Sequence, residues 1–258
     1  MNCHLLLIAA LFSAFCLSAS AQQNDSIAFD KCGTMQHLKQ KLDQNSILRE
    51  RFEQKKIEFN KIVSTRSYNN TAKLNAAVYI PVVFHIVLDN PNTITDAQIH
   101  AQLDTLNKDF FGANGDSSVI PLYFKPLFGK SNIQFCLAQR TPDGEATNGI
   151  DRVFTAQPSF DINDGVKHNF SGGVDSWNTD KYYNVWVCSL ASNLLGYASF
   201  PDDGSPAEQG VVIDYRTLPG SSALNFGEGK TLTHETGHYF NLYHIWGDDN
   251  GACTGTDY

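Results

Sequence analysis

The sequence has no excess of basic residues and no internal repeat. Its 27 Asp and Glu outnumber 19 Lys and Arg, which gives a net charge of −8 at pH 7. We therefore expect no binding of nucleic acid, because such binding requires a basic patch. A hydrophobic content of 42% favours a soluble globular protein.

The amino-terminal residues predict secretion. Residues 5–17 form an apolar run that only Ser13 interrupts, and this run is shorter than the roughly 20 residues that span a membrane. Residues 19–21 (Ala-Ser-Ala) then offer the small side chains that signal peptidase recognises. We interpret residues 1–21 as a signal peptide, so that Gln22 begins a secreted chain without a membrane span.

The most informative stretch is residues 234–244, His-Glu-Thr-Gly-His-Tyr-Phe-Asn-Leu-Tyr-His. His234 and His238 are four residues apart and therefore share one face of a helix, where both can bind one metal ion. His244 lies six residues further on, which is a poor helical spacing, so the chain must turn back near Asn241. Asn enters the left-handed region more readily than most residues. The spacing predicts Zn²⁺ held by three histidines, beside Glu235.

A purely structural explanation of this stretch is a core helix with solvated histidines along its polar edge. That explanation leaves Glu235, Asn241 and His244 as three separate coincidences, so we favour the zinc site. With three protein ligands, zinc keeps one position open for water and lowers the pKa of that water to about 7. Glu235 would act as general base and then return the proton to the leaving group.

The cysteines leave two interpretations open. Cys136 and Cys188 each follow an apolar stretch, so we place both on strands, where they form either a disulfide or two buried thiols. Cys253 adds an odd cysteine after the zinc motif, which suggests a partner beyond Tyr258.

The amino-acid composition and the hydrophobic pattern of the chain change near residue 73. Residues 37–63 are rich in Lys, Glu and Gln with apolar residues at helical spacing, and residues 43–46 interrupt this pattern and cap a second helix. Residues 64–71 are polar and without periodicity, so we predict an exposed linker, in which Arg66 is one candidate processing site.

From residue 73 the pattern predicts an α+β domain. Residues 94–110 form an amphipathic helix that backs the sheet, and the zinc helix begins near Gly229. These elements predict a twisted mixed sheet of five strands, namely residues 78–88, 132–138, 183–188, 195–200 and 210–215.

The zinc stretch resembles the metzincin pattern H-E-x-x-H-x-x-G-x-x-H, with Asn241 in place of glycine. Further segments resemble, in order, the secreted bacterial branch of the pappalysin family of metzincins, and they extend from about Leu74 to the end of the chain. These segments are residues 80–87, 147–150, 177–182, 195–198, 210–214 and 244–248.

This resemblance implies a zincin-like fold and a secreted zinc endopeptidase that cleaves protein or peptide substrates and is made as a zymogen. Residues 22–72 would be the propeptide, and residues 73–258 a catalytic domain. The family's lower subdomain carries a methionine turn, whereas the only methionines here are Met1 and Met35. The resemblance therefore implies that most of this subdomain is missing and that the domain is truncated at Tyr258.

The resemblance also assigns roles outside the zinc motif. Cys32, in Cys-Gly-Thr-Met, resembles the propeptide cysteine that keeps the zinc inactive, since a thiolate is a strong zinc ligand and displaces the catalytic water. The alternative is a dispensable thiol in a disposable segment. The resemblance further implies that an edge strand along which extended substrates align consists of Leu195, Gly196, Tyr197 and Ala198. The alternative is an ordinary edge strand.

Two further groups of residues allow weaker interpretations. Asp248, Asp249 and Asp257 could help to bind Ca²⁺, as in some members of the family, but we favour a solvated acidic loop, because the sequence does not show the remaining oxygen ligands. His85 lies in a strand that needs burial, so we expect a core histidine. The alternative function is a non-catalytic secreted zinc-binding remnant of a metalloprotease, but the intact Glu235 favours the enzyme.

Overall fold

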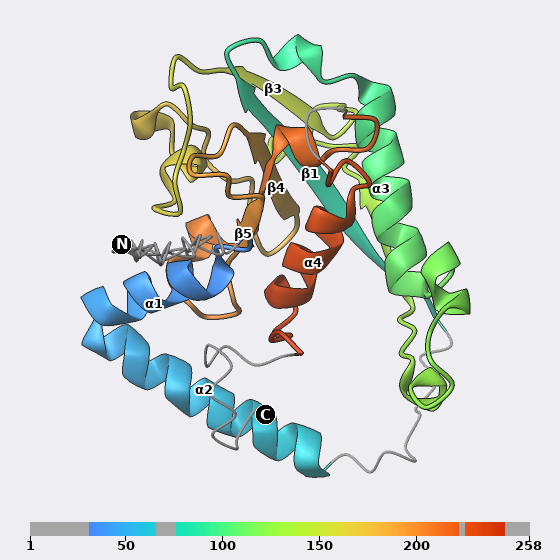
Figure 1. Cartoon of the computed structure of the whole chain (residues 1–258). Helices are drawn as coiled ribbons and strands as arrows, with labels where there is room; N and C mark the ends of the chain where they lie inside the picture. Colours follow the sequence, from blue (N-terminus) through green and yellow to red (C-terminus); the bar gives the residue numbers. More distant parts are fainter. Residues whose placement is uncertain (1–30, 66–75, 222–224, 246–258) are drawn as a thin grey trace, which may run out of the picture.

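The computed structural model describes residues 31–65, 76–221 and 225–245 of the chain. The predicted signal peptide, Arg66, Cys253 and the three aspartates proposed for calcium lie outside these residues. In the described part, a six-stranded sheet has two helices, α3 and α4, packed on one face, and two further helices cross below it (Figure 1). No helix among the described residues is long and apolar enough to cross a membrane.

The sheet is mixed, as predicted. Its order is β2-β1-β4-β6-β5, and β3 also pairs with β1. All pairs are parallel except β5 with β6, which are antiparallel. The strands are β1 (Val78–Leu88), β2 (Ile133–Leu137), β3 (Ile150–Phe154), β4 (Tyr183–Cys188), β5 (Gly196–Ala198) and β6 (Val211–Asp214).

The prediction of five strands was wrong by one, because β3 was not foreseen. β2 pairs with Val78–Val82 of β1, and β3 pairs with the following residues, Phe84–Leu88. Asp151 and Arg152 interrupt the apolar pattern of β3. Both side chains have polar partners from other parts of the chain, since Asp151 contacts His85 and Arg152 contacts Asp96.

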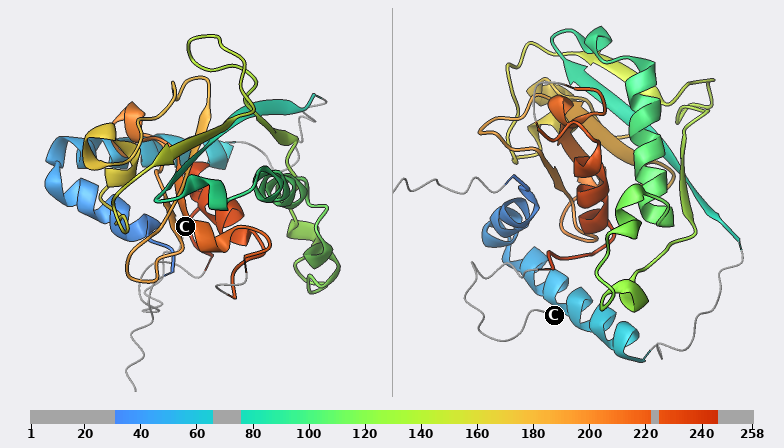
Figure 2. Two further views of the ribbon diagram at one scale, coloured as in Figure 1. Left: turned by 90° about the horizontal axis from the view of Figure 1, so that it is seen from above. Right: turned by 45° about the vertical axis from the view of Figure 1, so that its right-hand side comes forward.

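The face of the sheet that carries the helices holds the larger core. Helix α3 (Asp96–Phe111) begins with a capping box between Thr95 and Gln98 and ends at Gly112, where φ is 67°. It packs its buried face against the sheet, next to α4 (Lys230–Tyr239), as the two turned views show (Figure 2). The predicted backing helix and zinc helix are therefore confirmed.

The opposite face of the sheet has a second apolar core, in which Trp186 and Tyr197 are fully buried beneath the segment that follows β3. Cys188 belongs to this core, whereas Cys136 is only half-buried on β2, and both are free thiols. The disulfide interpretation of this pair is therefore wrong, and the interpretation as two buried thiols holds fully for Cys188 alone.

Two helices precede the sheet in sequence. α1 (Thr34–Gln44) and α2 (Ser46–Thr65) meet at Asn45, whose side chain accepts a hydrogen bond from Leu48 N at 3.0 Å. The predicted interruption is confirmed, although α2 continues to Thr65 and so includes the first two residues of the predicted linker. Leu38 and Phe52 of these helices bury Phe200 of the domain in a third, small core.

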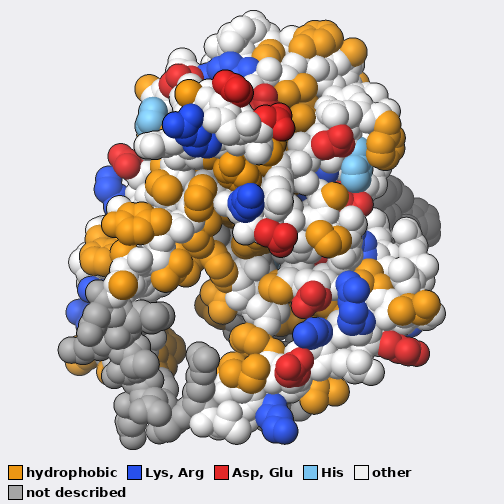
Figure 3. Space-filling view, turned by 180° about the vertical axis from the view of Figure 1, so that it is seen from behind, with side chains coloured by type: hydrophobic (Ala, Val, Ile, Leu, Met, Phe, Trp, Pro, Cys, Tyr) orange, Lys and Arg blue, Asp and Glu red, His pale blue; other side chains and the backbone are white. Residues whose placement is uncertain are grey.

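One part of the surface is unusually apolar. Hydrophobic side chains gather on the back of the molecule (Figure 3). The large hydrophobic residues that are exposed include several from the segment between α3 and β2, namely Val119, Leu122, Tyr123, Phe124 and Leu127.

Candidate metal centre

Helix α4 and the turn after it bring three imidazoles together. His234 Nε2 lies 3.1 Å from both His238 Nε2 and His244 Nε2, and the latter two are 3.2 Å apart. A triangle of nitrogens this tight cannot be held by hydrogen bonds alone, because each neutral ring offers only one donor and one acceptor. A cation at the centre removes this conflict, since all three nitrogens can then present lone pairs.

The spacing of the donors fits zinc. Tetrahedral coordination with Zn–N bonds of about 2.05 Å places neighbouring nitrogens about 3.3 Å apart. A cysteine sulfur at about 2.3 Å from the same ion would lie about 3.6 Å from each nitrogen. Cys32 Sγ is 3.4 Å from His238 Nε2. Cys32 and the three histidines therefore form a group of potential metal ligands whose ligand atoms all lie within 4.8 Å of one another. Among the described residues, it is the single such group.

The chain reversal that the third histidine requires is present. Asn241 has φ of 68°, and its amide donates to His238 O at 2.8 Å, which ends α4. The same turn brings Leu242 O to 2.7 Å from His238 Nδ1. Such a contact orients the ring, because Nδ1–H then donates to the carbonyl and leaves the lone pair of Nε2 for a metal.

Glu235 lies next to this group but is held by other partners. Its side chain is 1% exposed, and its Oε2 accepts a hydrogen bond of 2.6 Å from Thr34 Oγ1. A Cβ atom added to Gly196 would lie 2.9 Å from Glu235 Cγ. The edge strand therefore needs glycine at this position for the carboxylate to fit.

Cys32 reaches the histidines from the amino-terminal segment. Its Sγ is 3.6 Å from Glu235 Oε2, and the side chain is 9% exposed. Burial, followed by the charge of Glu235, raises the pKa of this thiol. In contrast, the N-terminus of α1, which begins two residues later, and a bound cation both favour the thiolate.

The segment around Cys32 extends the sheet by pairing with β5. Leu195 N donates to Lys31 O at 2.9 Å and Gly33 N donates to Gly196 O at 2.8 Å, so that Cys32 runs parallel to the strand. The predicted edge strand is therefore at the edge of the sheet, with a short strand-like segment already on it. Its predicted role toward substrates stays a prediction.

Thr34 is a site residue that the sequence did not reveal. Besides its bond to Glu235, its Oγ1 accepts a hydrogen bond of 2.8 Å from Ala198 N of β5. One buried hydroxyl thus connects the carboxylate of α4 with the backbone of the edge strand. The only available signal was its position two residues after Cys32.

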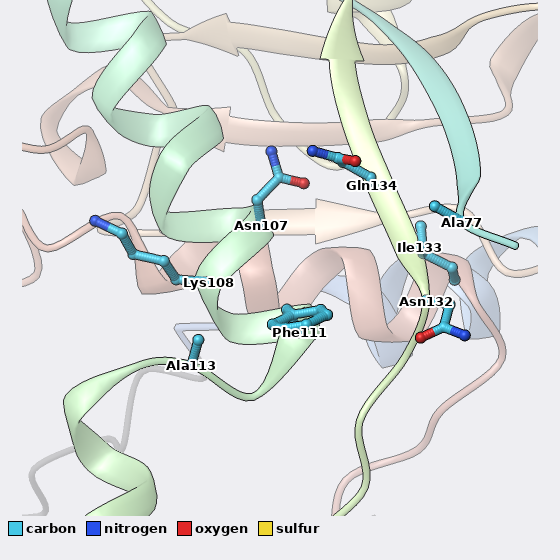
Figure 4. Close-up of a pocket in the computed structure, with 8 residues that line it drawn as sticks. All are labelled: Ala77, Asn107, Lys108, Phe111, Ala113, Asn132, Ile133 and Gln134. Carbon is cyan, nitrogen blue, oxygen red and sulfur yellow. The ribbon is translucent and has the colours of Figure 1, made fainter. Parts of the chain in front are cut away.

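Two other features are separate from this centre. His85 is fully buried, with Nδ1 at 3.0 Å from Asp151 Oδ2 and Nε2 at 3.0 Å from Asn184 Oδ1, so the prediction of a core histidine is confirmed. A pocket between α3 and β2, lined by residues such as Asn107, Phe111 and Ile133, contains none of the residues of the centre (Figure 4).

Comparisons with known proteins point in one direction. The peptidase M43 family model, described as pregnancy-associated plasma protein-A, matches residues 168–257. An extracellular metalloprotease of Arthroderma benhamiae is 32% identical over 192 residues, which cover 72% of this chain and 54% of that protein. The chain thus spans about half the length of this curated relative.

Two solved structures resemble the fold closely. A promirolysin mutant of Tannerella forsythia has a TM-score of 0.75 and 39% identity, and the match covers 88% of this chain and 73% of that one. Mature mirolysin of the same organism, in complex with a cleaved peptide, has a TM-score of 0.67 and 46% identity, with 70% of each chain covered.

Proposed function

This chain belongs to the pappalysin family of metzincins, and on that premise we propose that the protein is a secreted zinc endopeptidase made as a zymogen. The observation that carries the proposal is the convergence of His234, His238 and His244 beside the buried carboxylate of Glu235. The donor set, three neutral nitrogens at tetrahedral spacing, supports zinc as the metal. The names of the relatives, extracellular metalloproteases, support secretion.

The three histidines would hold the ion. When bound there, zinc supplies a Lewis acid and makes a water nucleophile available near neutral pH. Glu235 would accept the proton of the attacking water at its carboxylate and deliver it to the nitrogen of the leaving amine. In this structure the carboxylate is buried and accepts a hydrogen bond from Thr34, a contact that would be lost with the amino-terminal segment.

The edge of β5 would position the substrate once residues 31–33 have left it. An extended peptide can add to a sheet edge through main-chain hydrogen bonds, and residues 31–33 already make such bonds to Leu195 and Gly196. We place the scissile peptide bond beside Gly196, because the side chain of Cys32, opposite this residue, is the one that reaches the histidines.

Residues 22–72 would be the propeptide that keeps the enzyme latent. Cys32 Sγ lies where it can complete a tetrahedral ligand set, which would exclude the catalytic water. The promirolysin match also covers a larger share of this chain than the mature mirolysin match does, as expected if the amino-terminal segment corresponds to a propeptide.

The test uses the full-length protein in its processed form and a set of peptide substrates. We expect cleavage that stops on addition of a chelator and returns with Zn²⁺. Glu235→Gln should lower kcat by at least about 100-fold, the effect of losing a general base, while its zinc content stays near one ion per chain. Glu145→Gln, the same change on an exposed turn, is the matched control. Chelator-insensitive cleavage, or full activity of Glu235→Gln, would contradict the proposal.

A further inference from the structure

A pocket of buried carboxylates lies beyond the end of β5. Asp164 and Asp203 are 3% and 0% exposed, and Glu208 closes the pocket on the side nearer the solvent. The ammonium group of Lys167 also lines this pocket. Its Nζ lies 2.8 Å from Asp164 Oδ1 and donates a hydrogen bond to Glu208 O at 2.7 Å. We call Asp164, Asp203 and Glu208 the acidic pocket.

Two basic side chains of α1 occupy the acidic pocket. Lys41 Nζ is 2.9 Å from Asp164 Oδ2 and also 2.9 Å from Glu208 Oε2. His37 Nε2 is 2.8 Å from the same Asp164 oxygen. Both residues come from the segment that the proposed function removes. The pocket is therefore occupied by a ligand that the mature protein would no longer have.

Departure of α1 would leave the pocket with three carboxylates and one resident ammonium. Asp203 keeps its hydrogen bonds from Phe200 N and Gln209 Nε2. Asp164 Oδ2 and Glu208 Oε2, in contrast, lose Lys41, and a poorly compensated buried charge is unfavourable, so the vacated pocket favours an incoming cation. A second observation points the same way. The hydroxyl of Tyr197 on β5 is buried beside Asp164, whose charge, after burial itself, raises the pKa of this hydroxyl, yet it has no hydrogen-bond partner among the described residues.

The remaining titratable neighbour does not fill this role. His168 Nε2 lies 3.2 Å from Glu208 Oε1, on the side away from Lys41, and is half-buried at the rim. It therefore contacts only the outer carboxylate. Asp164 Oδ2, which contacts Lys41 and His37, becomes available once α1 has left, together with the hydroxyl of Tyr197.

We propose that the acidic pocket of the mature protein binds the ammonium group of a lysine side chain in the protein substrate, at a distance from the cleaved bond. This inference rests on the proposed function and adds a substrate feature to it. Lys41 is nine residues from Cys32, and seven helical residues beyond Thr34 correspond to roughly 10 Å. The pocket therefore contacts a residue several positions away from the scissile bond.

The geometry selects lysine over arginine. Lys41 bridges oxygens of two different residues, Asp164 and Glu208, with a single nitrogen. A compact ammonium group suits such an arrangement, whereas the planar guanidinium prefers both oxygens of one carboxylate.

The binding test uses a synthetic peptide of residues 34–46, which lacks Cys32 and so cannot ligate the metal. We expect the processed full-length protein to bind it, and expect Lys41→Met in the peptide to raise Kd at least about tenfold, because a charge-assisted hydrogen bond is lost. Equal affinity of the two peptides would overturn the inference. This test needs no catalysis, so it decides about the pocket even if the proposed activity is absent.

The kinetic test compares substrates that carry Lys, Arg or Met at successive positions on either side of the cleaved bond. At one distal position we expect a KM about tenfold lower for Lys than for Met, with kcat unchanged and Arg in between. Glu208→Gln is the informative variant, because this side chain is partly exposed and tolerates the change better than Asp164. It should remove the preference for Lys, whereas Glu145→Gln should keep it. Equal KM values at every position would contradict the inference.

Discussion

Thr34 Oγ1 lies 2.6 Å from Glu235 Oε2, so a residue of the amino-terminal segment holds the carboxylate that the proposed chemistry requires. The same hydroxyl accepts a hydrogen bond from Ala198 N on the edge strand. Thr34 therefore occupies two groups that a substrate and its attacking water would need. Latency would then depend on more than the thiol of Cys32.

Thr34→Val in the zymogen should speed its activation. Valine keeps the shape of the side chain but loses the hydrogen bond to a charged acceptor, which contributes about 1.5–3 kcal/mol. The rate at which activity appears is the measurement, and the kcat/KM of the processed enzyme should not change, because it no longer contains residue 34. Thr34→Ser restores the hydroxyl and should activate like the wild type. A Val variant that activates at the wild-type rate would contradict this role.

Gly33→Ala should also loosen the amino-terminal segment, for a steric reason. A Cβ at this position would lie 2.8 Å from Ile162 Cγ2 and 2.9 Å from Leu194 Cδ1. Such overpacking costs about 1–3 kcal/mol, so we expect residual activity in the unprocessed protein and a lower temperature for release of the segment. Gln36→Ala, on the exposed side of α1, is the control. Complete latency of Gly33→Ala would show that the contact adapts.

Asn241 should tolerate glycine but not alanine. Its φ of 68° lies in the left-handed region, where a residue other than Gly, Asn or Asp is disfavoured by about 1–2 kcal/mol. Asn241→Gly should keep the wild-type zinc affinity, while Asn241→Ala should weaken it and lower the free energy of unfolding. Competition with a chromogenic chelator measures the affinity. Equal zinc affinities of the two variants would contradict the role of this turn.

Asp109 should make the anchoring of α4 depend on pH. Its carboxylate accepts hydrogen bonds from Lys230 Nζ and Thr233 Oγ1, both at 2.7 Å. Burial alone would raise its pKa, but these bonds outweigh burial and hold the pKa below 3.8. The stability that they contribute is therefore complete above about pH 4 and is lost as the pH falls through the lower pKa of the folded state.

Urea unfolding of the full-length protein at several pH values tests this prediction. Asp109→Asn should lower the free energy of unfolding by about 2 kcal/mol at neutral pH. The difference from the wild type should shrink as the pH falls below 4. Asp104→Asn, an exposed position on the same helix, should show no such difference. A gap between Asp109→Asn and the wild type that stays constant with pH would exclude the proposed cause.

The zinc helix and its turn could be predicted from the sequence because both depend on local spacing. The spacing of four positions from His234 to His238 fixes a shared helical face, and Asn241 supplies the reversal that His244 needs. The long apolar run of β1 was equally clear. In contrast, β3 was missed because its charged residues, Asp151 and Arg152, find polar partners that are distant in sequence.

The acidic pocket could not be predicted for a related reason. Its carboxylates and their partners come from separate segments of the chain, and each alone resembles an ordinary solvated charge. Only the fold brings Lys41 to within 2.9 Å of both Asp164 and Glu208. The contact between Thr34 and Glu235 likewise joins residues 201 positions apart.

The two helices between Thr34 and Thr65 have a consequence for the timing of activation. A protease that cuts after α2 breaks one covalent link, but it touches neither the hydrogen bonds of Lys31 and Gly33 to the sheet edge nor the ion pairs of Lys41. Severing the chain and losing the inhibitory piece are thus separate events. On the proposed function, a nicked yet silent complex would exist between them, and its lifetime would be the delay between processing and the first turnover.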